Sequence, residues 1–482
     1  MVEPDAPHQD WGQAGLMALP PEAEFPSIRT AVLEQEMIPL LQSALLDGGR
    51  HSISALSTAR VFYLPNHSCS LRYEAEIVDE ATGAKLTWPL NARLYHGASE
   101  ARRHRDALLP LAEKVRDRNE VRCFTSLVSP LGPLNMIVEV FPIDAELPTL
   151  VDLTDVTVVT PLLAKALGAN ANEVAKDCKV QVGHYGRRHR CVLRYEIGRL
   201  SSLDSIDGPI RLYGKVTNDP RKVVSPRLIE ALRQGGLGGP AYAVPRCVGS
   251  YPSLGLSLLE DMPGRTMKHP LRDHLRGRAS RKSLELSVEW GIETAAGLLA
   301  ALHTCGVTAG QTRSLATEVA ALRHDIESIR RWLPDLGELL HDRLLQAHAT
   351  LKSSPALDPV LCHGDFRYSQ LLFNRETCTL LDFDTLCLAE PVLDVGHFLS
   401  YLELEALKPS VQSSDDALRL TNDLCSLFVD AYLAAVEGKF DGSLLRSRVT
   451  GYRDLSLVRM AVHSWQKMKM SRLSQVLAHL AS

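Results

Sequence analysis

The sequence predicts an α+β protein in which antiparallel hairpins precede a largely helical carboxyl-terminal part. Residues 179–197 and 360–385 alternate apolar and polar residues around glycine or polar turns, which is typical of β-hairpins. Residues 423–438 and 455–480 carry apolar residues at helical spacing. A chain of 482 residues is long enough for two or three domains of this kind.

Composition and charge exclude several classes of protein. Hydrophobic residues make up 45% of the chain and charged residues 23%, which is ordinary for a globular protein. The formal net charge of −4 predicts no nucleic-acid partner. The 10 cysteines are scattered without a CxxC spacing, so we expect neither a disulfide framework nor a zinc site.

The N-terminal segment and the apolar stretches predict where the protein acts. Residues 1–13 are polar and lack the basic start and apolar core of a signal peptide. The longest apolar helical stretch, near residues 295–302, is far too short to span a bilayer. We therefore expect a cytoplasmic protein with no membrane partner.

Residues that can carry chemistry are concentrated between 360 and 385. Gly364 permits a tight bend after a short apolar strand. A hairpin that closes beyond this bend would bring Asp365 and Asp382 to the same cleft. Two carboxylates in one place require a cation or a proton between them. The alternative is that both are ordinary loop acids at strand ends.

These residue types fit phosphoryl transfer. The reaction needs a carboxylate that orients and deprotonates a hydroxyl, and oxygen ligands that hold Mg²⁺ against the phosphates. Asp365 is the predicted catalytic base. The side-chain carbonyl of Gln370 and the carboxylate of Asp382 are the predicted Mg²⁺ ligands.

The motif HGDFRYSQ at 363–370, followed by LLDFD at 380–384, resembles the catalytic and metal-binding loops of the aminoglycoside phosphotransferase and choline kinase-like family. The resemblance implies a bilobal protein kinase-like fold and adds Asp384 to the metal ligands. Gln370 departs from the family pattern, which has Asn there, so the metal ligand must approach differently. The short segment from Asp384 to Pro391 has no room for the activation segment of protein kinases, which favours a small-molecule acceptor.

The resemblance also implies nucleotide-binding residues upstream. Gly183 and Gly186 could let backbone N–H groups approach phosphate, although a hairpin that only needs glycine to turn is an equal alternative. Lys215 is implied to contact the α- and β-phosphates, and Glu230 to pair with it, unless Glu230 is an ordinary surface residue. Glu260 ends an apolar strand whose following backbone is implied to bind adenine.

Two further polar residues receive structural interpretations. Asp394 opens a helix after the metal-binding segment, and we expect it to cap this helix and to hydrogen-bond the catalytic loop. His303 ends a helix that precedes the catalytic loop, and we expect it to be a packed residue and not a catalyst.

The amino-terminal third contains a second, incomplete copy of the nucleotide-binding pattern. The matching segments are CSLRYE (69–74) and CVLRYE (191–196), RLYHG (93–97) and RLYGK (211–215), and VEVFP (138–142) and LEDMP (259–263). Three matches in register indicate duplication, although shared strand composition is the alternative. In this alignment Gly97 replaces Lys215, so we expect the first copy not to bind nucleotide.

The sequence therefore predicts three parts: a degenerate kinase N-lobe-like domain at 1–150, a nucleotide-binding N-lobe at 151–264, and a helical C-lobe at 265–482. The predicted function is ATP- and Mg²⁺-dependent phosphorylation of a hydroxyl on a sugar-like or amino-alcohol acceptor. The alternative, favoured by Gln370, is a catalytically weak module that binds nucleotide or a partner. We expect the first domain to be dispensable for nucleotide chemistry and to offer a surface for a homo-oligomer.

Overall fold

The chain folds into two compact units. The first spans Met1–Val223 with Val248–Leu259 and Ser464–Met470, and the second spans the remainder. This computed structural model describes residues 24–46, 48–64, 68–187, 189–200, 208–277, 287–375, 377–408, 411 and 415–481. The segment 1–13, on which the prediction of no signal peptide depends, lies outside them. No helix in these described ranges is long and apolar enough to cross a membrane.

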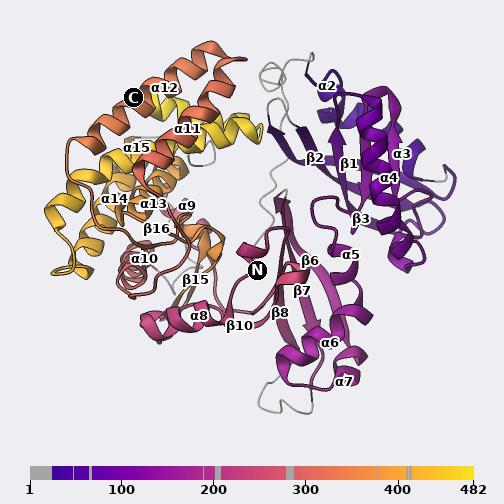
Figure 1. Cartoon of the computed structure of the whole chain (residues 1–482), viewed down its shortest axis with the longest axis horizontal. Helices are drawn as coiled ribbons and strands as arrows, with labels where there is room; N and C mark the ends of the chain where they lie inside the picture. The colour runs from indigo at the N-terminus through magenta and orange to yellow at the C-terminus, as the bar shows by residue number, and fades with distance from the viewer. Residues whose placement is uncertain are drawn as a thin grey trace. The chain divides into compact units, whose positions relative to one another are not determined.

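The first unit contains two five-stranded sheets (Figure 1). Antiparallel pairing gives the first sheet the order β1-β2-β3-β5-β4. Its strands are β1 (His51–Leu64), β2 (Ser68–Asp79), β3 (Lys85–Leu94), β4 (Val128–Leu131) and β5 (Met136–Val140), and its helices are α2 (Ile28–Val32), α3 (Glu34–Leu45) and α4 (Ala98–Val115). We call these elements, with the loop that follows β5, the first copy.

The second sheet repeats this order. Read from β6, it runs β6-β7-β8-β11-β10, which matches the first sheet strand for strand. Its strands are β6 (Cys178–Arg187), β7 (Arg190–Ile197), β8 (Ile210–Thr217), β10 (Cys247–Tyr251) and β11 (Leu256–Glu260); α5 (Leu150–Leu153), α6 (Val156–Leu167) and α7 (Ala171–Lys176) precede it. The predicted α+β fold and the duplication are therefore confirmed. We call this sheet with its helices the second copy.

Strand register corrects one detail of the predicted alignment. Counted from Cys69 on β2 and Cys191 on β7, the residues at the same position of β3 and β8 are Arg93 and Lys215. Gly97 lies beyond β3, where it precedes helix α4. Matching the identical residues RLY gave the wrong alignment, because this triplet lies at the end of β3 in the first copy but near the start of β8 in the second. A cation is therefore present in the first copy where the sequence alignment predicted its loss.

A second detail is displaced by one residue. Asn135 and Gly255 both adopt left-handed backbone, with φ of 48° and 63°, directly before β5 and β11. Counted from these two residues, Glu139 matches Leu259 and not Glu260. Side chains alternate between the faces of a strand, so the two glutamates point to opposite faces.

The second unit contains two small sheets and most of the helices. The predicted hairpin is confirmed, because β14 (Leu371–Asn374) pairs antiparallel with β15 (Thr377–Leu380). The other strands are β9 (Tyr242–Ala243), β12 (Gln311–Thr312), β13 (Val360–Cys362) and β16 (Cys387–Ala389). The helices are α8 (Pro226–Leu232), α9 (Lys268–Leu275), α10 (Val288–His303), α11 (Leu315–Arg330), α12 (Pro334–Lys352), α13 (Val392–Ala406), α14 (Asp415–Ala435), α15 (Gly442–Gln466) and α16 (Met470–Ala481).

Packing around Lys215 gives a test of the second sheet. An added Cβ at Gly214 would collide with the ring of Tyr195. We expect Gly214→Ala to lower the free energy of unfolding by about 1–3 kcal/mol through overpacking, measured by urea denaturation. Gly49→Ala is the control, because its Cβ meets no atom within 4 Å and its cost should stay below about 0.5 kcal/mol. Equal costs would contradict the packing described for β8.

Candidate active site

A buried carboxylate holds the backbone of the HGD loop. Asp394, in the first turn of α13, is fully buried. Its carboxylate accepts hydrogen bonds from the backbone N–H of His363 at 2.6 Å and of Gly364 at 2.8 Å, and lies 3.3 Å from Nε2 of His303. Burial would raise the pKa of Asp394, but the bond and charge of His303 and the N–H of His363 hold it below its usual value.

The predicted loop contact of Asp394 is confirmed, but its predicted capping role is wrong. Pro391 occupies the N-cap of α13. The carboxylate of Asp394 faces the loop, so it does not fold back on its own helix. His303 is buried and also hydrogen-bonds the hydroxyl of Tyr432 at 2.8 Å, which confirms its predicted packed role.

Gly364 provides the bend that places the next residue. Its φ of 77° lies in the left-handed region, and a Cβ there would collide with the carbonyl oxygen of Thr385. The hydroxyl of Thr385 donates to the carbonyl of His363 at 2.9 Å. The loop and the segment after the hairpin are therefore joined directly.

Three side chains meet the carboxylate of Asp365. Nε2 of His397 lies 3.1 Å from Oδ1, and the guanidinium of Arg367 lies 3.4 Å from Oδ2. Nε2 of Gln370 also lies 3.4 Å from Oδ2. The carboxylate is therefore oriented from both of its oxygens, as a positioned base requires.

The protonation of His397 follows from its partners. A carboxylate only accepts, so Nε2 of His397 carries the proton that faces Asp365, and Nδ1 accepts from the hydroxyl of Ser456 at 2.6 Å. Burial lowers the pKa of His397, while Asp365 opposes this shift. The imidazole is therefore neutral at pH 7 and acts as a fixed hydrogen-bond donor.

Gln370 contacts both acids, Asp365 before the first strand of the hairpin and Asp382 after the second. Its amide nitrogen lies 3.4 Å from Asp365 and 3.2 Å from Oδ2 of Asp382. Asp382 adopts left-handed backbone with φ of 67°, which turns the chain out of β15. Asp384 follows in the short 3-10 turn Phe383–Thr385. The folded hairpin therefore collects Asp365, Gln370 and Asp382 at one point.

These residues suit a hard divalent cation. Mg²⁺ prefers carboxylate and carbonyl oxygens, and two carboxylates converge on one amide here. The amide nitrogen of Gln370 faces both acids, so the side chain must turn about its last torsion to present its oxygen. The amide group is compatible with either orientation. The metal-ligand roles of Gln370, Asp382 and Asp384 stay predictions.

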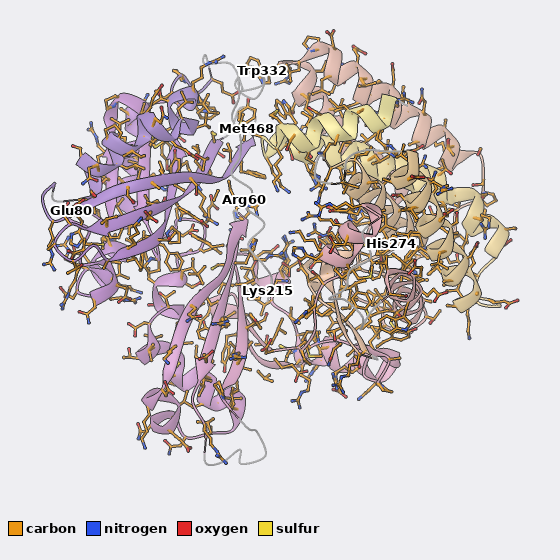
Figure 2. The ribbon with its side chains drawn as sticks, turned by 180° about the vertical axis from the view of Figure 1, so that it is seen from behind. Arg60, Glu80, Lys215, His274, Trp332 and Met468 are labelled. Carbon is orange, nitrogen blue, oxygen red and sulfur yellow. The ribbon has the colours of Figure 1, made fainter. Side chains whose placement is uncertain are left out.

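The predicted nucleotide residues lie on several elements. Gly183 and Gly186 belong to β6, and Lys215 is buried on β8, where Figure 2 marks it. Glu230 is exposed on α8, and its carboxylate accepts from Gln234 at 2.8 Å. Glu260 ends β11 and accepts from the backbone N–H of Arg246 at 2.7 Å. Their roles toward a nucleotide stay predictions.

Sequence reasoning missed three residues around Asp365. Arg367 and His397 contact the carboxylate, and Tyr401 lies under the guanidinium of Arg367 at 5.2 Å from its ring centre. Helical spacing could have identified His397, because positions three apart share a helix face and Asp394 already pointed to the loop. Arg367 is separated from Asp365 by one residue, and its proximity alone was a usable signal.

Comparison with known families gives one match. Residues 225–420 match the model of the phosphotransferase enzyme family (APH), which is less than half of the chain. This match confirms the predicted resemblance to the aminoglycoside phosphotransferase-like family over residues 225–420. Comparison with curated proteins gives no match.

Solved structures with some similarity include three kinases or phosphotransferases. A glucosamine kinase in complex with glucosamine, ADP and inorganic phosphate is 14% identical with a TM-score of 0.43, over 98% of this chain and 99% of that chain. Plasmodium vivax ethanolamine kinase is 14% identical with a TM-score of 0.44, over 67% and 87%. Macrolide 2'-phosphotransferase type I is 15% identical with a TM-score of 0.42, over 68% and 97%.

Replacing Asp394 tests its hold on the loop. Asp394→Asn should lower the free energy of unfolding by about 3 kcal/mol at pH 7, because the amide leaves backbone donors unpaired. The pKa of Asp394 is depressed, so its contribution is complete above its ordinary value of 3.8 and is lost as the pH falls further. Urea denaturation from pH 7 to pH 3 measures both effects.

The control for this substitution is Asp416→Asn. Asp416 is an exposed acid on α14 that pairs with Arg419 at 3.2 Å. Exposed pairs of this kind contribute about 0–1 kcal/mol. A similar loss in the two variants, or a loss in Asp394→Asn that does not shrink in acid, would contradict the assigned role.

Proposed function

We propose that this protein is an ATP-dependent kinase that transfers the γ-phosphate to a hydroxyl of a sugar-like or amino-alcohol molecule. The observation that carries the proposal is the meeting of Asp365 and Asp382 at the amide of Gln370. Phosphoryl transfer needs this combination of a positioned base and hard oxygen ligands, with little covalent help from the protein. The match to the phosphotransferase enzyme family over residues 225–420 supports the same reaction class.

In this proposal Asp365 handles the acceptor proton. His397 donates to Oδ1 of Asp365, and the acceptor hydroxyl would donate to Oδ2, which Arg367 and Gln370 also contact. As the hydroxyl oxygen forms its bond to phosphorus, its proton passes to Asp365, and the bond from phosphorus to the ADP oxygen breaks. Arg367 lies beside Asp365 and would offset the negative charge of the carboxylate.

Gln370, Asp382 and Asp384 would hold Mg²⁺, and the second sheet would bind the nucleotide through Lys215 and the β6–β7 hairpin. Bound Mg-ATP supplies the phosphoryl group and neutralises the charge that develops on it. Glu230 and Glu260 keep their proposed places as the partner of Lys215 and at the adenine segment. The paired strands of the hairpin, Leu371–Asn374 and Thr377–Leu380, contain none of the residues assigned to the metal.

The acceptor is proposed to be small. From Asp384 the chain passes through a 3-10 turn and the strand β16 directly into α13. A peptide substrate usually docks on an extended segment at this position, and the described chain is too short there to provide one. The competing function is a weakly active module that binds nucleotide or a partner, for which the bridging amide of Gln370 is the supporting observation.

The direct test is incubation of the protein with Mg-ATP and a panel of sugars and amino alcohols, followed by mass spectrometry of the products. Asp365→Asn should lower turnover by about 100-fold or more, because a positioned base is lost, while nucleotide affinity measured by calorimetry changes little. Asp358→Asn, an exposed acid before β13, is the control. Loss of affinity together with turnover would argue against Asp365 as the base.

Position 370 separates the kinase from the weakly active alternative. Gln370→Asn should keep measurable activity, since a carbonyl oxygen survives, and Gln370→Leu should lose it together with the response to Mg²⁺ concentration. The measurement is the initial rate at fixed ATP over a Mg²⁺ titration. A Leu variant as active as the parent would remove Gln370 from the metal site.

A further inference from the structure

Tyr185 connects the glycine hairpin of the second copy to the first copy. It lies on β6 between Gly183 and Gly186, and it is buried. Its hydroxyl donates to the carboxylate of Asp144 at 2.5 Å and accepts from the side-chain amide of Asn91. Both of these residues belong to the first copy.

A guanidinium completes this group. The Arg72 guanidinium lies over the ring of Tyr185, 3.2 Å from its centre, and donates to Asn91 at 2.8 Å and to Asp144 at 3.4 Å. All four residues are at most 9% exposed, so their hydrogen bonds form out of water, where they are strongest. We call Arg72, Asn91, Asp144 and Tyr185 the Tyr185 cluster.

The tip of the same hairpin has its own contact with the first copy. Nδ1 of His189 lies 2.9 Å from the side-chain amide nitrogen of Asn218 and 3.1 Å from the carboxylate of Glu146, which also pairs with Arg93. Arg93 occupies the position of Lys215 in the first copy. Its charge is therefore balanced by Glu146 within the first copy.

The hairpin needs such support because its own pairing is interrupted. The β6–β7 register shifts between Val182 and His184 and again between His184 and Arg187, which includes both glycine positions. Irregular pairing of this kind leaves the backbone with fewer regular cross-strand hydrogen bonds. Tyr185 lies within the second irregular stretch. The contact with the first copy therefore falls where β6 is least fixed by its partner strand.

We infer that the first copy is a positioning element for nucleotide phosphates, which acts by fixing the β6–β7 hairpin through the Tyr185 cluster and Glu146. This inference rests on the proposed role of that hairpin in ATP binding. A fixed hairpin presents its backbone N–H groups without an ordering cost at each binding event. The inference replaces the expectation that residues 1–150 are dispensable for nucleotide chemistry.

The test uses Tyr185→Phe in the full-length protein, which removes one hydroxyl and keeps the ring. We expect KM for ATP to rise about 10-fold, the net value of one buried hydrogen bond, with kcat changed less than about 3-fold and KM for the acceptor unchanged. Amide hydrogen exchange across β6 and β7 should accelerate about 10-fold. A variant that is only less stable would instead have a lower kcat and a smaller active fraction. It would not raise KM for ATP while leaving KM for the acceptor unchanged.

Tyr63→Phe is the matched control. Tyr63 lies as far before Cys69 as Tyr185 lies before Cys191, and it is also buried in the first hairpin, but its hydroxyl donates to Glu24. The Tyr63→Phe substitution should change neither KM for ATP nor amide hydrogen exchange in β6 and β7. Glu146→Gln is a second variant that keeps the size of the side chain, and it should shift both readouts in the same direction as Tyr185→Phe.

Two outcomes would overturn the inference. In the first, the unmodified protein phosphorylates an acceptor, but Tyr185→Phe and Glu146→Gln change neither KM for ATP nor amide hydrogen exchange in β6 and β7. The other is an equal effect of Tyr63→Phe. A parent that neither binds ATP nor transfers phosphate would contradict the proposed function instead, and the exchange comparison would still decide whether the first copy fixes the hairpin.

Discussion

The hydrogen bonds from the HGD loop to the carboxylate of Asp394 are the constraint on which the rest of the site depends. A buried charge is costly unless donors surround it, and here the donors are backbone N–H groups of the loop and the ring of His303. The loop backbone is thereby fixed to α13. The same helix carries His397, which orients Asp365. One rigid helix therefore sets both the path of the loop and the direction of the base.

Local patterns in the sequence were sufficient for part of this site. The hairpin β14–β15 and its acids could be predicted because turn residues and alternating strands act over a few positions. Ser456 could not be placed in the same way, since its contact with His397 joins α15 to α13 through tertiary packing. The metal assignment of Gln370 depended on its residue type, and only the folded chain brings its amide beside both acids.

The two similar sheets show where alignment by identical residues alone gives the wrong equivalences. The order of strands agreed with the predicted duplication, but Gly97 was aligned with Lys215 because three identical letters outweighed the register of the strands. By strand register, Arg93 occupies the position in β3 that Lys215 occupies in β8. The charge of Arg93 is balanced by an ion pair with Glu146. The contacts of Tyr185 were equally hidden, since Arg72 and Asn91 become neighbours only when β2 pairs with β3.

The core of the second copy has a consequence for the ancestry of the chain. Phe141 and Leu147, in the loop that follows β5 of the first copy, are buried in the same core as Leu193 and Tyr195 of β7. After the duplication the two copies therefore ceased to be interchangeable modules, because each substitution in this core had to suit its neighbours from the other copy. Loss of the first copy would therefore open a hole in the core of the second.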